Sequence, residues 1–412
     1  MKRLKRLLAV CQIAALCLCL SGCWDMVEIN DRLCIRGVGI DVGEQEGMIS
    51  VTFQMLLPYE TSDIQGTPMY QNLTIEAATV SEAVDLLATD VEQKPHFEHL
   101  SAIVLGEETA KRAAVHVLDY FYRVPQVRRN CEIVAVNGLA QDLIASSVMD
   151  GGVGEYIENM IKTHDNRGHF SEQPSAMSRI FVKDANDEAF YLPMLDYQNL
   201  ENTQQDGQES QPAQQGSGGA ASSGGDSQGE GKSADAESLK VAGALLFDER
   251  RFVGTLNTAQ LDLLHLLQDQ QKGMVLTLSE AAGIHARFSF RVDESEVAIQ
   301  CQVEEDHFVF PIQVQVQCLL IEAWDGTGRE LSTEEFYTGA EQSLEAYLTG
   351  QLQALIQQTQ RLGADVIGFS RLARQTHYQW YQNQGRPWRT AFRAAEFPLT
   401  VDVTLKRGGH VQ

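Results

Sequence analysis

The chain has 412 residues, a formal net charge of −24 at pH 7 and a sequence isoelectric point near 4.8. This acidity argues against a nucleic-acid-binding protein, because such proteins present basic patches to the phosphate backbone. It also repels anionic lipid, so a stable attachment to a membrane would need a separate anchor.

The first 22 residues have the layout of a secretory signal peptide. Basic residues lie between Lys2 and Arg6, and an apolar run follows from Leu7 to Leu20. The run is shorter than the roughly 20 apolar residues that a membrane-spanning helix needs, so it predicts a signal peptide at 1–22. An uncleaved anchor and a buried helix are weaker alternatives.

The segment Leu20-Ser21-Gly22-Cys23 resembles a bacterial lipoprotein box. In such a box a diacylglyceryl group is attached to the cysteine sulfur, and cleavage leaves that cysteine as the new N-terminus. Two acyl chains anchor a protein stably, whereas one chain holds it only marginally. We therefore expect lipidation at Cys23 to keep the mature chain on the lipid bilayer.

The residues directly after Cys23 are candidates for contact at the membrane surface. Trp24 suits the interface, because its ring is apolar while its N–H can stay hydrated. The carboxylates of Asp25 and Glu28 would lie within reach of basic groups on a partner protein. The alternative interpretation is a plain spacer.

Residues 202–237 are rich in Gln, Gly, Ser, Asp and Ala. Such a segment cannot bury enough apolar surface to offset its chain entropy, which predicts a disordered linker. The linker divides the mature chain into an N-terminal block at 23–201, with room for two subdomains, and a C-terminal domain at 238–412.

The N-terminal block alternates strand and helix patterns. Residues 49–55 alternate apolar and polar side chains, and Ser81 opens a helix with Val84, Leu87 and Val91 on one face. The order continues with a strand at 100–105, a helix at 107–122, a strand at 131–136 and a helix at 139–148. This alternation predicts a sheet with covering helices.

The C-terminal block starts with strand-like runs at 240–247 and 251–256. Between Ile312 and Cys318 apolar residues alternate with glutamines, which predicts a half-buried strand with one hydrated face. A last alternating strand carries Phe397, Leu399, Val401, Val403 and Leu405 on one face.

A long amphipathic helix lies between these strands. Ser332 and Glu335 are spaced as a capping box, an apolar stripe runs from Leu344 to Leu362, and Gly363 closes it. The whole chain is therefore predicted to be a multi-domain α+β or mixed α/β protein. Its N-terminal block combines sheet and helices, and its C-terminal domain packs an antiparallel sheet on one long helix.

Cysteine usage gives no sign of a metal site. After removal of the signal peptide and lipidation of Cys23, the remaining cysteines are Cys34, Cys131, Cys301 and Cys318. They are scattered without CxxC spacing, which argues against zinc. Cys318 fits a small core residue. Whether any pair forms a disulfide stays open.

The patterns that could carry chemistry all favour structural interpretations. Gly37, Gly39 and Gly43 do not make the dinucleotide fingerprint, and a glycine-containing strand near the membrane is the better interpretation. His96 and His99 follow Pro95 and lack the helical zinc-protease frame, so they are expected in a turn or on the surface.

Two further patterns are equally weak. Asp184, Asn186 and Glu188 resemble part of a calcium loop but lack its glycine, so an acidic turn is expected. The glutamines on the long helix are expected to face solvent, although a partner-binding face stays open: Gln351, Gln353, Gln357, Gln358 and Gln360. With no nucleophile elbow and no phosphate-binding loop, we expect no enzyme, no cofactor and no metal.

Several motifs in sequence order resemble the Ger(x)C family, the C subunits of nutrient germinant receptors in endospore-forming bacteria. The N-terminal matches are Cys23-Trp24-Asp25 with Glu28-Ile29, then Gly37-Val38-Gly39-Ile40-Asp41, the run from Glu98 to Glu107, and Asp119 to Arg123 with Gln126-Val127-Arg128. The C-terminal matches are Ala242 to Phe247, Arg251 to Leu256, Asp365-Val366-Ile367-Gly368-Phe369, Trp388 and Phe392.

The resemblance covers nearly the whole mature chain and implies several mixed α/β domains. It implies a lipoprotein on the outer face of the spore inner membrane, working with an A-type and a B-type membrane subunit and without catalysis. The long polar linker departs from the family pattern and leaves the domain joints open.

Two functions from other classes stay as alternatives. A solute-binding lipoprotein of a membrane transporter shares the anchor and the α/β content, but needs two similar lobes around a ligand cleft. A secreted lipoprotein hydrolase needs a nucleophile or metal motif, which the sequence does not show.

Overall fold

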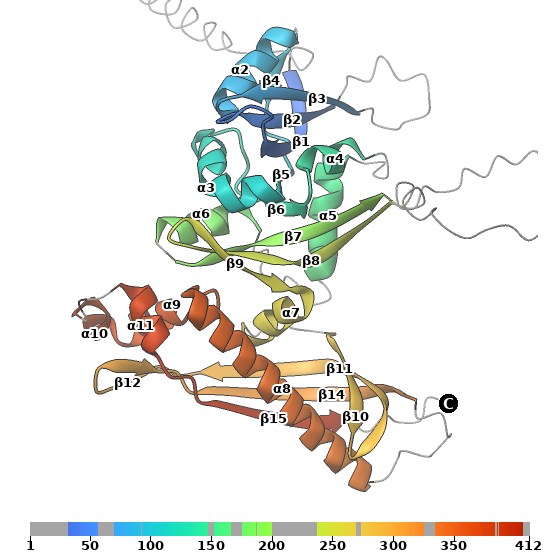
Figure 1. The fold of residues 1–412 in the computed structure, drawn as a ribbon, viewed down its shortest axis with the longest axis vertical. Coiled ribbons are helices and arrows are strands. Elements are labelled where there is room, and N and C mark those ends of the chain that lie inside the picture. The colour runs from blue at the N-terminus through green and yellow to red at the C-terminus, as the bar shows by residue number, and fades with distance from the viewer. Residues whose placement is uncertain are drawn as a thin grey trace, which may run out of the picture.

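The computed structural model describes residues 32–56, 70–91, 93–146, 152–165, 175–186, 188–199, 237–268, 273–324, 334–383, 385 and 387–406. These residues form an elongated body with two large sheets arranged along its long axis, the first sheet and its helices at one end and the second sheet at the other (Figure 1).

The first sheet has nine strands within the described residues. Along the sheet they are ordered β3 (Tyr70–Ala77), β2 (Ile49–Leu56), β1 (Arg32–Val42), β5 (Ala102–Gly106), β6 (Glu132–Asn137), β7 (Phe190–Asn199), β8 (Glu237–Asp248) and β9 (Arg251–Asn257). The short β4 (Lys94–His96) pairs with the start of β1.

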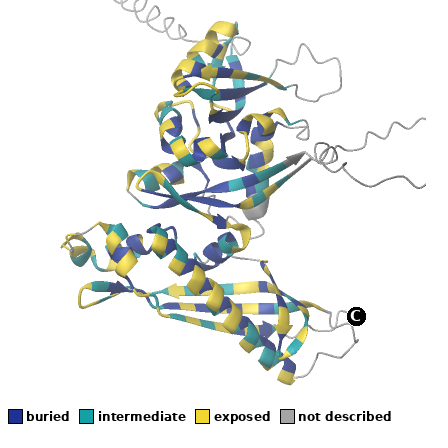
Figure 2. Ribbon diagram, in the orientation of Figure 1, coloured by how far each residue is buried: buried dark blue, intermediate teal, exposed yellow. Residues whose placement is uncertain are grey.

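The centre of this sheet is parallel and its margins are antiparallel. Strands β1, β5, β6 and β7 run parallel to one another, while β2 and β3 extend one margin and β8 and β9 the other as antiparallel pairs. Parallel neighbours need long crossovers, which helices supply here, and so both faces of the central strands are buried (Figure 2).

One helix layer covers each face of the first sheet. The first layer comprises α2 (Val80–Asp90), α3 (Glu107–Arg123) and α6 (Met177–Ala185). The second comprises α4 (Ala140–Ala145), α5 (Val153–Asp165) and α7 (Thr258–Leu267). Alternate residues of each strand serve the two layers: in β5, Ile103 and Leu105 face the first, and Ala102 and Val104 the second.

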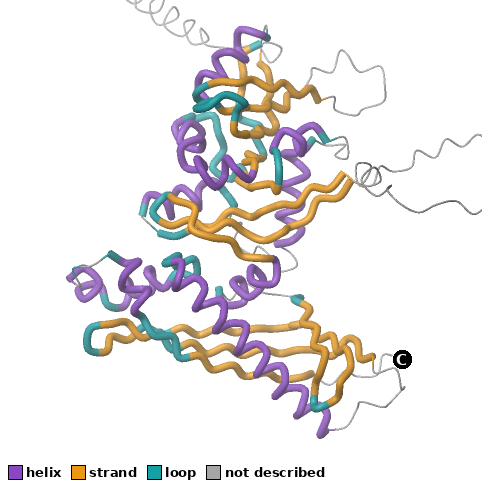
Figure 3. The backbone as a smooth tube through the Cα atoms, viewed as in Figure 1, coloured by secondary structure: helices purple, strands orange, loops and turns teal. Residues whose placement is uncertain are grey.

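The second sheet is ordered β10 (Val275–Ala281), β11 (Ile284–Ile299), β14 (Ile312–Trp324) and β15 (Leu399–Lys406). The long α8 (Glu334–Leu362) crosses it obliquely (Figure 3) and buries an apolar stripe that includes Leu344, Leu348 and Leu352. The small elements beside them are β12 (Gln302–Glu304), β13 (His307–Val309), α9 (Phe369–Thr376), α10 (Tyr378–Asn383) and α11 (Trp388–Ala394).

The two sheets share one hydrophobic core. A continuous cluster of buried residues joins Val134 of β6 and Leu246 of β8 to Leu264 of α7, Leu355 of α8 and Val316 of β14. Helix α7 lies between β8 and α8 and contacts both. Because burial of apolar surface is the main favourable contribution to folding, this shared core joins the two sheets into one body.

The predicted fold class is confirmed. The predicted strands and helices are present, with boundaries that differ by a few residues; α2, for example, begins at Val80, after Thr79 accepts a hydrogen bond from the Glu82 N–H at 3.2 Å. Gly363 adopts a φ of +77° directly after α8, as expected of a residue that ends a helix. Ser332, the other half of the expected capping box, lies outside the described residues.

Two details differ from the sequence-based expectation. The runs 240–247 and 251–256, which we placed in the C-terminal domain, are β8 and β9 and complete the first sheet, because β8 pairs antiparallel with β7 from Phe190 to Asn199. The second sheet is not wholly antiparallel: β15 runs parallel to β14, since the chain returns through α8 and three short helices rather than through a hairpin. The division at 202–237 stays a prediction, with only Glu237 of that segment described.

Candidate functional site

The residues proposed for the membrane anchor precede the described part of the chain. Cys23, Trp24, Asp25 and Glu28 lie outside the described residues, which begin at Arg32, the first residue of β1. Lipidation and surface contact therefore stay predictions.

A polar pocket lies where the parallel strands begin. Its volume is about 240 Å³ and its lining comes from β1, the turn before β5, the loop before β6 and α5: Arg36, His99, Leu100, Ser101, Arg128, Asn130, Glu155, Glu158 and Asn159. Arg36 Nη2 lies 2.9 Å from Glu155 Oε2, and Arg36 Nη1 donates to the His99 carbonyl at 3.4 Å. Arg36, one of two arginines that line the pocket, thus connects β1 with α5.

Local backbone features bring Arg36 to this position. The pairing of β1 with β2 shifts register between Ile35 and Gly37, and such a bulge re-aims the side chain of the extra residue. The Arg36 carbonyl accepts from the Ser101 N–H at 3.0 Å. A side chain at Gly154 would collide with this carbonyl, so glycine at the start of α5 permits the close approach.

Two of the family-like motifs meet at Asp41. This buried carboxylate, at the end of β1, accepts from the N–H groups of Ala140 at 2.8 Å and Gln141 at 2.9 Å, which begin α4. Burial raises the pKa of Asp41, and the two hydrogen bonds oppose that shift. Gly106 of β5 lies against the same carboxylate.

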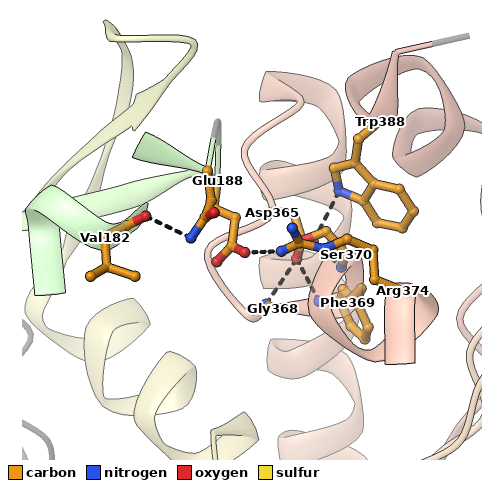
Figure 4. A network of polar contacts seen from close by, with 9 residues as sticks. Val182, Glu188, Asp365, Gly368, Phe369, Ser370, Arg374 and Trp388 are labelled. Atoms are coloured by element: carbon orange, nitrogen blue, oxygen red, sulfur yellow. Dashed lines mark hydrogen bonds and ion pairs between the residues drawn. The ribbon is translucent and has the colours of Figure 1, made fainter. Parts of the chain in front are cut away.

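A second buried carboxylate, that of Asp365, holds together the last family-like motif, which consists of Asp365–Phe369, Trp388 and Phe392 (Figure 4). It accepts from the N–H groups of Gly368 at 2.9 Å, Phe369 at 3.0 Å and Ser370 at 2.6 Å, which open α9. It also accepts from Trp388 Nε1 at 3.0 Å. Burial raises the pKa of Asp365, and the backbone hydrogen bonds from Ser370, Gly368 and Phe369 oppose that shift. Both halves of the motif therefore meet at one carboxylate.

Ion pairs connect the first sheet with the helices beside the second. Glu188, between α6 and β7, pairs with Arg374 of α9 (Figure 4). Arg389 Nη1 of α11 lies 3.4 Å from Asp248 Oδ2, at the turn between β8 and β9. Burial raises the pKa of Asp248 to about 6, although Arg389 opposes the shift. These contacts add to the shared apolar core at the junction of the two sheets.

The sequence predicted turn or surface positions for His96 and His99 and an acidic turn at 184–188, and the structure differs at His96, which lies in a strand. His96 is half-buried in β4, between Arg32 at 3.3 Å and Glu98 at 3.1 Å, while His99 is exposed in the following turn. Asp184 forms an ion pair with Arg250, and Glu188 forms one with Arg374. Asn186 is the C-cap residue that directly follows α6. Across the described ranges, no three His, Cys, Asp or Glu side chains are grouped to hold a metal ion.

The glutamines of α8 are only partly a solvated face. Gln351, Gln353 and Gln357 are exposed, as expected. Gln358 bonds instead to Gln260 of α7 at 2.6 Å and to the Thr255 carbonyl of β9 at 3.0 Å. Gln360 donates to the carbonyls that end α11, at 2.8 Å for Ala395. These two glutamines join elements far apart in sequence, which helical periodicity could not reveal.

The cysteines within the described ranges, Cys34, Cys131, Cys301 and Cys318, are free thiols. Cys318 is fully buried, as expected of a core residue, and burial raises its pKa to about 12. A thiol with so high a pKa is a poor nucleophile, because the thiolate is the reactive form. Among the helices that the structure describes, none is long and apolar enough to cross a membrane.

Sequence reasoning missed Asp365 as an organising residue. The usual signal was absent, because a capping aspartate normally occupies the N-cap itself, whereas Asp365 lies three residues before the N-cap Gly368 of α9. It missed the Arg36–Glu155 pair for a different reason: the two residues are 119 positions apart, and no local pattern links them.

Comparisons with known proteins all find spore germination proteins, with matches on both parts of the chain. The family described as "Spore germination protein N-terminal domain" matches residues 25–197, and "Spore germination B3/ GerAC like, C-terminal" matches residues 242–409. The crystal structure of the GerBC protein superposes with a TM-score of 0.55 at 17% identity, covering 93% of this chain and 100% of that one. At that identity the likeness shows the fold.

Relatives in Bacillus subtilis (strain 168) include the putative spore germination protein YfkR, 21% identical over 96% of this chain and 94% of that protein. Spore germination protein YndF is 21% identical over 100% of this chain and 99% of its own length. Spore germination protein B3 is 34% identical over 129 residues, which are 31% of this chain and 34% of that protein.

Proposed function

The chain belongs to the Ger(x)C family of spore germination proteins, and on this basis we propose that it is a membrane-anchored lipoprotein subunit of a nutrient germinant receptor. The observation that carries the proposal is the ordered match of both family domains, which together extend from residue 25 to residue 409. The proposal assigns it no catalytic step.

The proposed anchor is a diacylglyceryl group on Cys23. It rests on the lipoprotein box and on the signal-like residues before it. With a net charge of −24, the chain needs such an anchor for stable attachment to an anionic membrane at physiological salt. The location that follows is the outer face of the spore inner membrane.

The proposed partners are the A-type and B-type membrane subunits of the same receptor. Trp24, Asp25 and Glu28 follow the anchor directly and would lie at the membrane surface, where Trp24 suits the interface and the carboxylates suit basic groups of those subunits. The core shared by the two sheets supports a role by contact, because it keeps the surfaces of one body in a fixed arrangement.

The transporter-type alternative, a solute-binding lipoprotein, finds no support in the described residues. That class closes two similar lobes around its ligand. Here the first sheet has nine strands with helices on both faces, and the second has four strands with one long helix across it. The two parts are dissimilar and share a core where a cleft would have to open.

Purification from spore membranes tests the proposal. Tagged wild-type chain should be recovered in the membrane fraction together with the A-type and B-type subunits. After a high-salt wash, Cys23→Ser should leave the membrane fraction in spores that lack those subunits, because the acceptor of the lipid is gone and salt screens any remaining electrostatic attachment. Cys34→Ser is the matched control and should stay. If Cys23→Ser stays fully in the membrane fraction after this wash without the other subunits, the anchor proposal is wrong.

The proposed contact of Trp24, Asp25 and Glu28 with the partner subunits is tested separately on the same spore membranes. Replacing Trp24, Asp25 and Glu28 together by Ala, with Cys23 kept, should reduce recovery of the partner subunits while membrane attachment persists. Unchanged recovery would assign this stretch to the spacer role.

A further inference from the structure

Cationic side chains gather where the parallel strands of the first sheet begin. Arg32 of β1 pairs in register with Lys94 of β4. The loop that enters β6 carries Arg128 and Arg129, and Arg128 lines the polar pocket beside His99. Parallel strands begin at the same end of a sheet, so these residues lie together where the strands start. We call this surface the basic edge and define it as Arg32, Lys94, Arg128 and Arg129.

The charge of the basic edge is only partly compensated: Glu98 lies near Arg32, and Glu155 and Glu158 line the same pocket as Arg128. Lys94, Arg128 and Arg129 are exposed, and none of the ion pairs formed among the described residues includes them. The cations on the neighbouring α3 differ, since Lys111, Arg112 and Arg123 each pair with a carboxylate four residues earlier in the same helix. A surplus of positive charge is unusual on a chain of net charge −24.

Exposed apolar side chains lie beside this edge on α6. Phe181 is 39% exposed and Val182 is 54% exposed, while Met177 and Ile180 of the same helix are buried against the sheet. The Arg129 guanidinium lies over the Phe181 ring, 5.5 Å from its centroid. Cations flanking exposed aromatic and aliphatic side chains are the composition of surfaces that rest on lipid headgroups.

The length of the tether brings this surface to a membrane. Arg32 is nine residues beyond Cys23, a distance that an extended chain spans in about 30 Å at most. A lipid on Cys23 would therefore hold the start of β1 close to the bilayer. The negative charges of the rest of the molecule act weakly there, because salt screens them beyond about 10 Å.

We propose that the basic edge, with Phe181 and Val182 beside it, rests on the anionic headgroups of the membrane and fixes the orientation of the chain on it. This inference rests on the anchor in the proposed function. The lipid would supply the affinity, and the edge would decide which surfaces face the membrane and which face the partner subunits.

The test uses vesicles and the mature chain with Cys23→Ser, so that no lipid contributes to binding. Cosedimentation is measured with phosphatidylcholine vesicles and with vesicles that also contain phosphatidylglycerol, at low and high salt. We expect binding only to the phosphatidylglycerol vesicles, and weaker binding at high salt. The triple variant Lys94→Glu, Arg128→Glu, Arg129→Glu should bind roughly tenfold less or weaker still.

The matched control changes charge equally at exposed arginines of the other sheet and its helices: Arg287→Glu, Arg291→Glu and Arg371→Glu. It should bind like the parent chain, and circular dichroism should show that both triple variants fold. A second variant, Phe181→Ser with Val182→Ser, should bind less at every salt concentration, because its loss is not electrostatic.

Equal binding by the two triple variants, or no binding of the parent chain to phosphatidylglycerol vesicles, overturns the proposal. If the edge variant binds vesicles like the control but recovers less A-type or B-type subunit from spore membranes, the edge contacts protein and the lipid assignment is wrong. None of these results depends on lipidation, so the proposed function keeps its own test at Cys23.

Discussion

The carboxylate of Asp41 occupies the space that a side chain at position 106 would need, so Asp41 and Gly106 fit together because residue 106 is glycine. Asp41 is the second-last residue of β1, and Gly106 ends the neighbouring parallel strand β5. From this position Asp41 accepts hydrogen bonds from the first two N–H groups of α4. Motifs that are 65 residues apart in sequence thus form one contact.

Gly106→Ala should destabilise the fold by about 1–3 kcal/mol, because the added methyl group displaces the buried Asp41 carboxylate from α4. Urea unfolding of the purified chain measures this. Gly350→Ala is the control: position 350 lies in α8 with no other atoms near its missing side chain, so alanine should stabilise by up to about 1 kcal/mol. Equal effects at both positions would contradict the role given to the Asp41–Gly106 contact.

Asp365→Ala should cost about 3 kcal/mol or more, because four donors lose one acceptor in a buried site. Trp388→Phe removes one of these donors and keeps the ring, so it should cost about 1 kcal/mol. Urea unfolding, followed by near-ultraviolet circular dichroism, reports both values. A loss for Trp388→Phe as large as that for Asp365→Ala would mean that ring packing, rather than the carboxylate, organises this region.

Asp248 should make stability depend on pH. Its pKa is raised to about 6 in the folded state, so the folded chain binds its proton more tightly than the unfolded chain does. The stability linked to this proton is complete below about pH 4 and is lost as the pH rises through about 6. Asp248→Asn removes the titration, so the variant should gain stability relative to the parent chain between pH 4 and pH 7.

The relative gain should be at most about 3 kcal/mol, and the exposed part of the site reduces it. Urea unfolding of both chains across this range measures the difference. A constant difference would show that Asp248 has an ordinary pKa, and a difference of opposite slope would show that Arg389 outweighs the effect of burial.

The sequence was sufficient for the local elements and insufficient for their pairing. Strict alternation from Ile312 to Cys318 and the apolar stripe from Leu344 onward predicted β14 and α8, because both depend on short-range periodicity. It gave no information that β8 joins β7 across 202–236, because strand pairing depends on side-chain fit between segments far apart in the chain. Composition predicted a domain boundary at this segment, although the strands on either side of it, β7 and β8, belong to the same sheet.

The same limit applies to the candidate site. Cys23 is recognisable because lipidation depends on a contiguous box. The basic edge draws on Arg32, Lys94 and Arg128, which only the parallel pairing of β1, β4, β5 and β6 brings to one margin. The long-range pairs, such as Glu188 with Arg374, have no local signature at all.

Limited proteolysis tests whether a cut in the chain between β7 and β8 also separates the two parts of the molecule. A nonspecific protease should cut first within 202–236, because a Gln-, Gly- and Ser-rich segment has little apolar surface to bury. The two fragments should stay together in native gel filtration and separate only in denaturant, because β7 and β8 pair over their whole lengths and the core is shared. Fragments that separate without denaturant would contradict the shared core.

Germination of spores that carry an in-frame deletion of this chain tests the central claim most directly. Loss of optical density is followed nutrient by nutrient in a strain without a paralogous receptor, and again after complementation with the wild-type chain. The account predicts that the response to one set of nutrients is abolished, that receptor-independent germination persists and that complementation restores the response. Normal germination of the deletion spores with every nutrient would contradict the claim that the chain is a receptor subunit.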